Sequence, residues 1–250
     1  MQGTMDVALQ TSQKIMDMHC HILPGLDDGC RNMEETVRTL QEAAKQQVNR
    51  MIVTPHFHPG RYMVPASLVL KTLDDVRSEC EDRDLKIDLY PGQECYYYTG
   101  LAEQLNAGNA LTLAGSRYVL VEFEPNCLFH YLLGGLRDLQ QNGYIPILAH
   151  FERYRCLQKE ENLRIVKEHG FLLQMNFDTL LYKDHFFSKK PWRRMIKSGI
   201  VDFLGSDCHG MDFRPLCVSD GYEWMRANLS REQCKHILKD NIQNILQNRY

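Results

Sequence analysis

The 250-residue chain lacks several features that would place it in a specialised class. It has no excess of basic residues, since 29 Lys and Arg stand against 32 Asp and Glu for a formal charge of -3. This balance excludes a global attraction to nucleic acid or to an anionic membrane. The chain also has no long apolar run, and its N-terminal residues show neither a basic start nor an apolar stretch. We therefore expect a cytoplasmic protein without a membrane span.

Cysteine pairs and linkers are missing as well. The nine cysteines are an odd number and form no C-x-x-C pair, so we expect reduced thiols and not a disulfide framework. No low-complexity or linker-like tract divides the chain. We expect residues 15–250 to form a single domain and residues 1–14 to be a poorly ordered or peripheral extension.

Short apolar runs of strand length recur along the chain, with helical patterns between them. The seven runs are residues 14–19, 50–55, 87–92, 118–123, 145–150, 171–176 and 201–207. Such alternation predicts parallel strands joined by helices. One helix is expected to follow Asn32, with Asn32 as its cap and Glu35 three residues on, and others are expected to end at Gly143 and Gly170.

Residue types that bind metals stand at the C-terminal end of nearly every run. They are His19, His21, His56, Glu94, Glu122, His150, Asp207 and His209. In an α/β barrel these strand ends meet on one face, whereas an open sheet spreads them along a line, so convergence favours a barrel. Imidazoles and carboxylates suit zinc, manganese or iron in hydrolytic sites, and they are too many for one ion. We therefore expect a centre of several ions with a bridging carboxylate.

The first motif is "MDMHCHILPGLDDG", residues 16–29. In an extended strand Asp17, His19 and His21 would share one face, while Cys20 would point to the other. A second D-x-H pattern, "SDCH" at 206–209, follows another predicted strand and strengthens the metal interpretation. Four isolated histidines are not expected to be ligands: His130, His169, His185 and His236.

Together these motifs resemble the polymerase and histidinol phosphatase (PHP) family of metal-dependent phosphoesterases, and most closely its branch of bacterial capsule-type protein tyrosine phosphatases. The matching segments are DMHCHILPGLDDG, TPHFHPG, PGQECYY, YVLVEF, ILAHFERY and GSDCHGMDFRP, in that order across residues 17–215. The resemblance covers most of the chain. It implies a distorted (β/α)7 barrel with a metal centre at the C-terminal ends of the strands.

The resemblance further implies three divalent transition-metal ions, manganese first, with iron or zinc as alternatives. One ion would take His19, His21, Glu94 and Asp207; Glu94 would bridge to a second, held by Glu122 and His150; the third would take Asp28, His56 and His209. Asp17 would be an outer carboxylate that orients a histidine. Asp27 would support the turn with Gly25 and Gly29. His58 stands where relatives vary and is a candidate substrate contact.

The implied chemistry is direct attack of an activated hydroxide on phosphorus, without a covalent enzyme intermediate. Arg153 and Arg214 follow ligand positions and are candidate phosphate-binding groups, because guanidinium groups match phosphate oxygens. The alternative for Arg153 is a salt bridge with Glu152. A phenolate leaving group, with a pKa near ~10, needs little help from an acid, and Asp207 or His209 is the candidate donor.

The expected function is dephosphorylation of phosphotyrosine in a protein, linked by family analogy to capsular or exopolysaccharide synthesis. The analogy suggests the tyrosine-rich tail of a bacterial tyrosine kinase as substrate, and no nucleic acid partner. The alternatives are a phosphatase of histidinol phosphate or another small molecule, a nuclease, and a binding module without catalysis.

Three features leave other interpretations open. Cys208 and Arg214 have the C-x5-R spacing of cysteine-dependent phosphatases, but only Gly210 lies between them, where a phosphate loop is usually rich in glycine. The basic segment 183–197 is interpreted as an amphipathic helix in preference to a nucleic-acid track. The aromatic run 95–100 is either a substrate-facing rim or ordinary packing.

Overall fold

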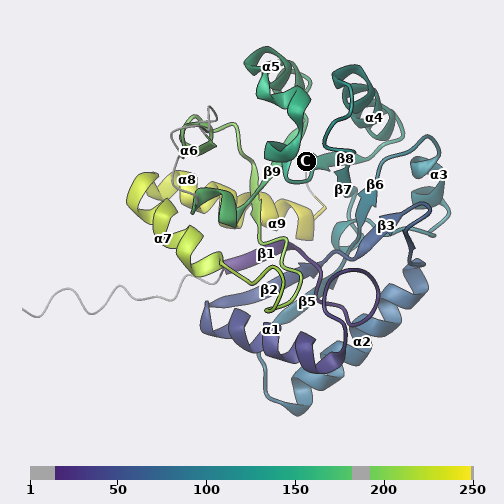
Figure 1. Ribbon diagram of the computed structural model, residues 1–250, viewed down its shortest axis with the longest axis vertical. Coiled ribbons are helices and arrows are strands. Elements are labelled where there is room, and N and C mark those ends of the chain that lie inside the picture. The colour runs from purple at the N-terminus through teal and green to yellow at the C-terminus, as the bar shows by residue number, and fades with distance from the viewer. Residues whose placement is uncertain (1–14, 182–191, 249–250) are drawn as a thin grey trace, which may run out of the picture.

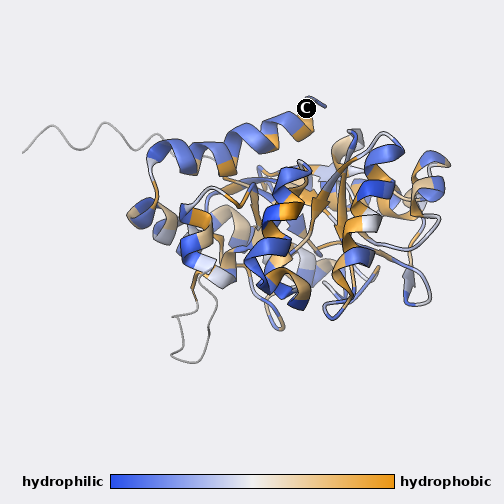
Figure 2. Cartoon of the chain, turned by 90° about the horizontal axis from the view of Figure 1, so that it is seen from above, coloured by the Kyte–Doolittle hydropathy of each residue, from blue (hydrophilic) through white to orange (hydrophobic). Residues whose placement is uncertain are grey.

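The structure of the chain, a computed structural model, describes residues 15–181 and 192–248. The expectation for residues 1–14 therefore lies outside the described residues. Strands occupy the centre of the molecule and helices lie around them (Figure 1), and the helices carry hydrophilic residues on their outer faces (Figure 2). The predicted mixed α/β architecture is confirmed.

Each of the seven predicted runs overlaps a strand. The described strands are β1 (Ile15–Cys20), β2 (Val48–Val53), β3 (His56–His58), β4 (Tyr62–Met63), β5 (Asp88–Pro91), β6 (Glu94–Tyr96), β7 (Tyr118–Glu122), β8 (Ile145–Leu148), β9 (Leu172–Asn176) and β10 (Phe203–Gly205). The described α-helices are α1 (Met33–Lys45), α2 (Ala66–Asp82), α3 (Leu101–Asn106), α4 (Phe129–Gln141), α5 (Glu160–Glu168), α6 (Trp192–Lys197), α7 (Val218–Asn228), α8 (Arg231–Lys235) and α9 (Asn241–Leu246). Short helical turns are η1 (Leu113–Gly115), η2 (Phe151–Arg153), η3 (Arg155–Gln158), η4 (Phe177–Leu180) and the π-helical η5 (His236–Asp240).

The helix boundaries follow the predicted signals. The Asn32 side chain accepts a hydrogen bond of 3.0 Å from the backbone N–H of Glu35 and caps α1. Gly143 and Gly170 follow the ends of α4 and α5 with φ of 88° and 78°, a conformation that glycine adopts at little cost. Both predicted helix ends are therefore confirmed.

The strands form two sheets in the described part of the chain. The smaller has the order β1-β2-β5 and the larger the order β10-β9-β8-β7-β6-β3-β4. Every pair is parallel except the β3–β4 hairpin. The predicted parallel strands are confirmed, although two sheets replace a single ring of uninterrupted strands.

Two strands are interrupted where the sheets diverge. Pro55 separates β2 from β3 and lacks the N–H that a central strand would need. Gly92 lies between β5 and β6, and a Cβ there would lie 2.9 Å from Ile52 Cγ2, so any larger residue would force that side chain to shift. Beyond β1 and β10, the N–H of Asp207 donates to His19 O and the N–H of His21 donates to Cys208 O, both at 2.8 Å. These bonds join the outer strands of the two sheets.

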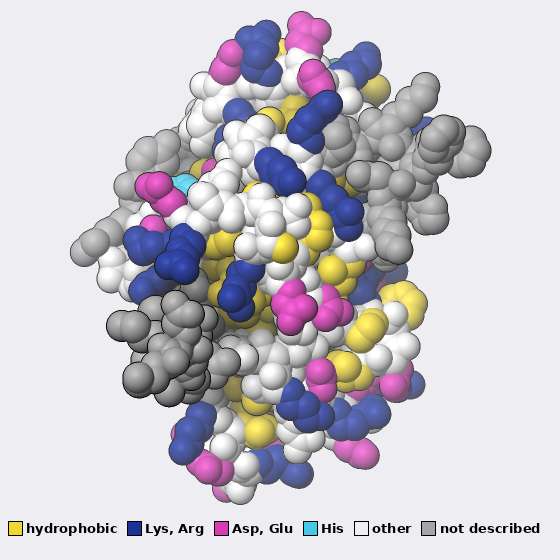
Figure 3. All heavy atoms as spheres, turned by 90° about the vertical axis from the view of Figure 1, so that its left-hand side faces the viewer, with side chains coloured by type: hydrophobic (Ala, Val, Ile, Leu, Met, Phe, Trp, Pro, Cys, Tyr) yellow, Lys and Arg dark blue, Asp and Glu magenta, His cyan; other side chains and the backbone are white. Residues whose placement is uncertain are grey.

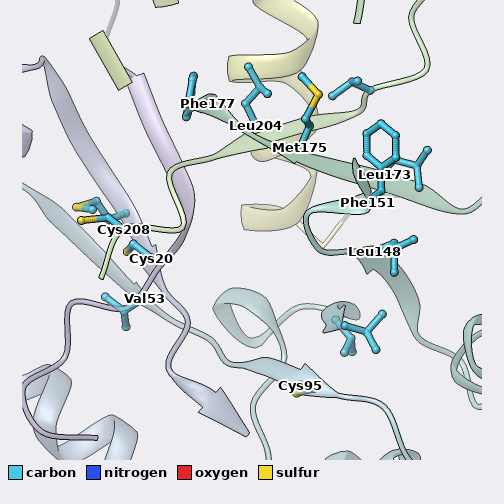
Figure 4. Packing of buried hydrophobic residues seen from close by; sticks show 14 of the residues in the cluster. Cys20, Val53, Cys95, Leu148, Phe151, Leu173, Met175, Phe177, Leu204 and Cys208 are labelled. Carbon is cyan, nitrogen blue, oxygen red and sulfur yellow. The ribbon is translucent and has the colours of Figure 1, made fainter. Parts of the chain in front are cut away.

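Two groups of buried side chains make up the core. The smaller group takes residues from strands of both sheets, among them Met16 and Met18 of β1 and Leu120 of β7, together with Ile242 and Ile245 of α9. The larger group includes the residues that face the surrounding helices. Figure 4 shows part of this larger group, with Cys20 and Cys208 next to each other beside Val53.

The strict alternation predicted for β1 is wrong at one point. Met18 packs in the smaller group and Cys20 in the larger, and the register of β1 shifts between Asp17 and Cys20. Such an irregularity re-aims the side chains that follow it. Cys20 does point away from the histidines, as predicted, but Asp17 is turned toward Ser206, whose hydroxyl and backbone N–H both donate to its carboxylate.

The surface agrees with the balanced composition. On the face drawn in Figure 3, basic side chains are interspersed with acidic ones. Among the described helices, none combines the length and apolar character needed to cross a bilayer. Residues 183–191 of the basic segment lie outside the described residues; the rest forms α6, where Met195 and Ile196 are buried and Trp192 packs edge-on against Phe151.

Candidate metal centre

The nine side chains predicted to bind metals lie together near strand ends, and two of them, His56 and Glu94, begin the short strands that follow β2 and β5. His19 and His56 are on β1 and β3, Glu94 and Glu122 are on β6 and β7, and His150 directly follows β8. His21 follows β1, Asp28 lies in the loop before α1, and Asp207 and His209 follow β10. Their position explains the pattern in the sequence, because parallel strands bring their carboxyl ends to one edge.

Three overlapping groups of these side chains are close enough to hold ions. They are His19, His21, Glu94 and Asp207; His21, Asp28, His56 and His209; and His56, Glu94 and Glu122, each with ligand atoms within 4.8 Å of one another. The grouping differs from the expected sets in two ways. His21 and His56 each belong to two groups, and His150 belongs to none of them. His150 Nε2 nevertheless lies 2.8 Å from Glu94 Oε1 and 3.6 Å from Glu122 Oε2.

In the first group, the two histidines carry their protons on the ring nitrogen that faces away from the other ligands, as metal-binding histidines do. His19 Nδ1 lies 3.1 Å from Gln174 Oε1, and His21 Nδ1 lies 2.8 Å from Asp27 Oδ2. Both oxygens only accept hydrogen bonds, so both Nδ1 atoms must carry the proton. If both imidazoles are neutral, the two Nε2 atoms, 3.2 Å apart, face each other with lone pairs. Either a proton on one of these atoms or a metal ion between them would offset this repulsion.

Unpaired polar atoms in the same cluster support this interpretation. Within the described residues, Glu94 Oε2, His56 Nδ1 and His150 Nδ1 are buried and have no hydrogen-bond partner. Glu94 Oε2 lies 3.2 to 3.3 Å from nitrogen atoms of three histidines. A buried carboxylate oxygen without a partner is costly, and a cation would remove that cost. The residues present therefore fit bound metal ions.

The carboxylates also change the proton affinity of the histidines. Burial alone would lower the pKa of His21, His56 and His150, but the charges of Asp27 and Glu94 outweigh burial. The pKa is raised to about 9 for His21, about 12 for His56 and about 10 for His150. The cluster therefore attracts positive charge, which either protons or metal ions can supply.

Asp207 joins the metal cluster to the two predicted arginines. Arg153 Nη2 and Arg214 Nη1 donate to the same Asp207 Oδ2, at 2.6 and 2.7 Å. The alternative for Arg153 is wrong, because Glu152 instead accepts from the N–H of Asn176 and the hydroxyl of Thr179. Burial raises the pKa of Asp207, but His19 and Arg153 outweigh burial and hold it well below its usual range.

A pocket of about 230 Å³ opens above this cluster. Asp28, His56, Glu94, Glu122, His150, Asp207 and His209 line it, together with Arg153 and Arg214. His58 lines the same pocket, and the centroid of its ring lies 4.0 Å from the centroid of the Tyr96 ring. The aromatic run 95–100 divides accordingly: Tyr96 faces the pocket, whereas Tyr97 is buried with its hydroxyl on Asp138.

The cysteine alternative finds no support in the geometry. Cys208 is fully buried next to Cys20, and burial raises the pKa of its thiol, the opposite of what a thiolate nucleophile needs. Its sulfur faces the carbonyl of Gly210 at 3.9 Å. Of the four histidines set aside, His130, His169 and His236 lie outside the three groups, and His185 lies outside the described residues.

Sequence reasoning missed Gln174 and Asn176 as supporting residues, and it missed the contacts of Asp27 with two histidines. Asp27 does support the turn, since Oδ1 accepts from the Gly29 N–H, but Oδ2 also holds the His21 ring and the His56 backbone. Gln174 holds the His19 ring, and Asn176 donates to Asp207. The signal was a pair of amides two residues apart in an otherwise apolar strand, where polar groups need a specific partner.

Comparison with known proteins agrees with this geometry. A family model described as "Capsular polysaccharide synthesis, CpsB/CapC" matches residues 15–247. The tyrosine-protein phosphatase CpsB of Streptococcus agalactiae is 27% identical over 242 residues, which cover 94% of this chain and 100% of that protein.

Solved structures agree with the sequence comparison. One described as YwqE from Bacillus subtilis and CpsB from Streptococcus pneumoniae, "unique metal-dependent tyrosine phosphatases", has a TM-score of 0.86 at 26% identity, covering 94% of this chain and 96% of that one. An amidohydrolase from Mycoplasma synoviae has a TM-score of 0.60 at 11% identity over 93% of this chain and 87% of that one, which shows likeness of fold alone. The chain belongs to the CpsB/CapC family of capsular polysaccharide synthesis.

Proposed function

We propose that this chain is a metal-dependent protein-tyrosine phosphatase, a phosphomonoester hydrolase connected with capsular polysaccharide synthesis. The observation that carries the proposal is one pocket in which metal-ligand groups meet two guanidinium groups. Family membership and the named activity of the relatives point to the same chemistry.

The proposed architecture is a single domain over residues 15–250, a distorted (β/α)7 barrel of the PHP type. Its support is the set of backbone bonds that joins the ends of β1 and β10, together with a small core that draws on strands from both sheets. The interruptions at Pro55 and Gly92 would be the distortion.

The proposed cofactors are three divalent transition-metal ions, with manganese as the first candidate and iron or zinc as alternatives. The nine ligands would be His19, His21, Asp28, His56, Glu94, Glu122, His150, Asp207 and His209. Glu94 would bridge two ions, because its two oxygens face different histidines: Oε1 faces His150, and Oε2 faces His19, His21 and His56. Bound ions would supply Lewis-acid activation of water at neutral pH.

The protein's own contribution would be to bind and orient the phosphate. Arg153 and Arg214 are 35% and 31% exposed at their side chains and lie at the pocket, so their remaining N–H groups can reach phosphate oxygens. Asp207 would stay ionised, because its pKa is held low, and would not serve as the acid. Burial and the charge of His21 lower the pKa of His209, which is itself a proposed ligand, so His209 would not hold the proton either; a phenolate with a pKa near ~10 leaves with little help from an acid.

The proposed substrate is a phosphotyrosine side chain on a flexible protein segment. Family analogy suggests the tyrosine-rich tail of a bacterial tyrosine kinase, and the cytoplasm as the place of the reaction. His58 on β3 and Tyr96 on β6 line one side of the pocket, where their rings would pack against the ring of the substrate.

The deciding experiment is a hydrolysis assay on EDTA-treated protein with Mn²⁺, Fe²⁺ or Zn²⁺ restored separately. We expect phosphate release from a phosphotyrosine peptide, little from the matched phosphoserine peptide, and little with histidinol phosphate or single-stranded DNA. Activity confined to histidinol phosphate or DNA would overturn the proposal. Lack of bound transition metal in protein purified without chelator would instead support a binding module.

A further inference from the structure

Strand β9 supplies none of the nine proposed ligands, yet two of its side chains lie between ligands of other strands. Gln174 and Asn176 are 0% and 1% exposed. They are two residues apart on β9, which pairs with β8 on one side and β10 on the other. Buried amides are costly unless their donors and acceptors are paired, so their partners indicate their role.

Gln174 contacts two of the proposed ligands. Its Oε1 accepts from His19 Nδ1 at 3.1 Å and from the backbone N–H of His150 at 2.8 Å. The opposite orientation of the amide would set its NH2 group against the His150 N–H, so the oxygen must be on this side. The proton of His19 is thereby held on Nδ1, and Nε2 is left to face Glu94 and Asp207.

Asn176 continues the chain of hydrogen bonds to a third ligand. Its Oδ1 accepts from Gln174 Nε2 and its Nδ2 donates to Asp207 Oδ2, both at 2.9 Å. With Arg153 and Arg214, Asn176 occupies Asp207 Oδ2. Asp207 Oδ1 is left facing His19 and His21, each at 3.5 Å.

We propose that Gln174 and Asn176 act as a pair of positioning residues that presents His19, His150 and Asp207 to the metal in ligand geometry. The proposal rests on the proposed function only in that the site must take a metal. The pair fixes which atom of each ligand is available, and its expected effect is therefore on metal affinity.

The test compares the affinity of EDTA-stripped protein for Mn²⁺, measured by competition with a chelator dye. Gln174→Met keeps the length and volume of the side chain but removes both amide functions. We expect Mn²⁺ binding to weaken by about 10–100-fold. Gln174→Glu keeps the acceptor for His19 and His150, replaces the bond to Asn176 with two facing oxygen atoms, and adds a negative charge that attracts cations, so it should weaken binding less than Gln174→Met.

Gln46 offers a matched control. Its side chain also bridges two backbone groups, accepting from the Ser219 N–H and donating to the Leu216 carbonyl, but it touches no proposed ligand. Gln46→Met should lower the unfolding temperature and leave Mn²⁺ affinity unchanged. Wild-type affinity in Gln174→Met, or equal weakening in Gln46→Met, would overturn the pair's role.

Two further outcomes have separate meanings. If Gln174→Met does not fold, Asn176→Ser replaces it, because this variant removes the amide from Asp207 and leaves Gln174 in place. Unchanged Mn²⁺ affinity in a folded Asn176→Ser protein would then overturn the proposal, and weaker binding would support it. If the wild-type protein itself binds no Mn²⁺, Fe²⁺ or Zn²⁺, the proposed function fails and the role of the pair in presenting metal ligands is overturned with it.

Discussion

At the scale of single residues, the two carboxylate oxygens of Asp207 have different partners. One oxygen accepts from Arg153, Arg214 and Asn176, and the other faces His19 and His21. The carboxylate therefore holds the two arginines, the proposed phosphate-binding groups, and the proposed metal cluster at a fixed separation. Because the two arginines share one oxygen, each keeps N–H groups for a substrate phosphate.

The arginines give the first prediction. Arg153→Lys and Arg214→Lys keep the positive charge but lose the planar pair of donors, so each should lower kcat/KM for a phosphotyrosine peptide by about 10²-fold. Steady-state kinetics with metal content measured in the same samples will check this. Arg155→Lys is the matched control, since Arg155 is exposed and outside the pocket lining. Equal rates in all three variants would rule out the assigned roles.

Cys208 gives a second prediction at the same scale. Its buried thiol cannot reach a phosphate, so Cys208→Ser should retain activity on the phosphotyrosine peptide and iodoacetamide should not inhibit the wild-type enzyme. EDTA should abolish activity in both proteins, and restored metal should return it. Loss of activity in a folded Cys208→Ser protein that still binds metal would instead favour a cysteine nucleophile.

At the scale of elements, the contact between β1 and β10 is as important as any single ligand. The bonds that follow these strands join the two sheets and set Asp207 beside His19. Gly205, the last residue of β10, permits this approach, because a Cβ there would lie 2.6 Å from His19 Cβ and 3.1 Å from the Gln174 amide nitrogen. Glycine is needed at this position because a side chain would collide with His19, and not because of the backbone dihedral angles.

We therefore predict that Gly205→Ala destabilises the fold by about 1–3 kcal/mol and weakens metal binding, because His19 must move. Urea unfolding and chelator competition measure the two effects. Gly134→Ala is the control: Gly134 is exposed within α4 with open space around it, so alanine there should stabilise by roughly 0.5–1 kcal/mol. Unchanged stability in Gly205→Ala would show that β1 and β10 can separate at little cost.

The sequence predicted seven of the strands and the clustering of the side chains at their ends, because apolar runs follow local periodicity. The short strands β3, β4 and β6 were not predicted, and Asp28 was included only through the family resemblance. The sequence could not predict the register shift in β1, which turns Asp17 to Ser206 and leaves the orientation of His19 to Gln174. Nor could it predict the division into two sheets at Pro55 and Gly92. Both depend on contacts between distant strands, which no local pattern contains.

At the scale of the whole molecule, the folded chain holds many ionisable groups in one buried place. His21, His56 and His150 gain carboxylate neighbours on folding, and their pKa values are raised to about 9, 12 and 10 from an ordinary value of 6.5. Folding is thereby linked to the uptake of positive charge. Protons supply it in the metal-free protein, and divalent ions supply it in the metal-bound protein.

As the pH rises, the stability of the metal-free protein should therefore fall, whereas the stabilisation caused by Mn²⁺ should grow. A histidine whose pKa is raised by folding stabilises the folded protein fully below pH 6.5, its pKa in the unfolded chain. This stabilisation is lost as the pH rises toward the pKa in the folded protein, which is about 9 for His21. Between pH 6 and pH 9 the EDTA-stripped protein should lose about 3 kcal/mol of stability from His21 alone, and His56 and His150 should add to this loss. With Mn²⁺ at a fixed concentration, binding tightens as imidazoles lose protons, so the shift in unfolding temperature caused by Mn²⁺ should grow over the same range.

Calorimetric scans of the metal-free and the Mn²⁺-bound protein from pH 6 to pH 9 measure both effects. A metal-free protein whose stability rises with pH would show that its histidines are neutral, and that the carboxylates do not act on them as argued.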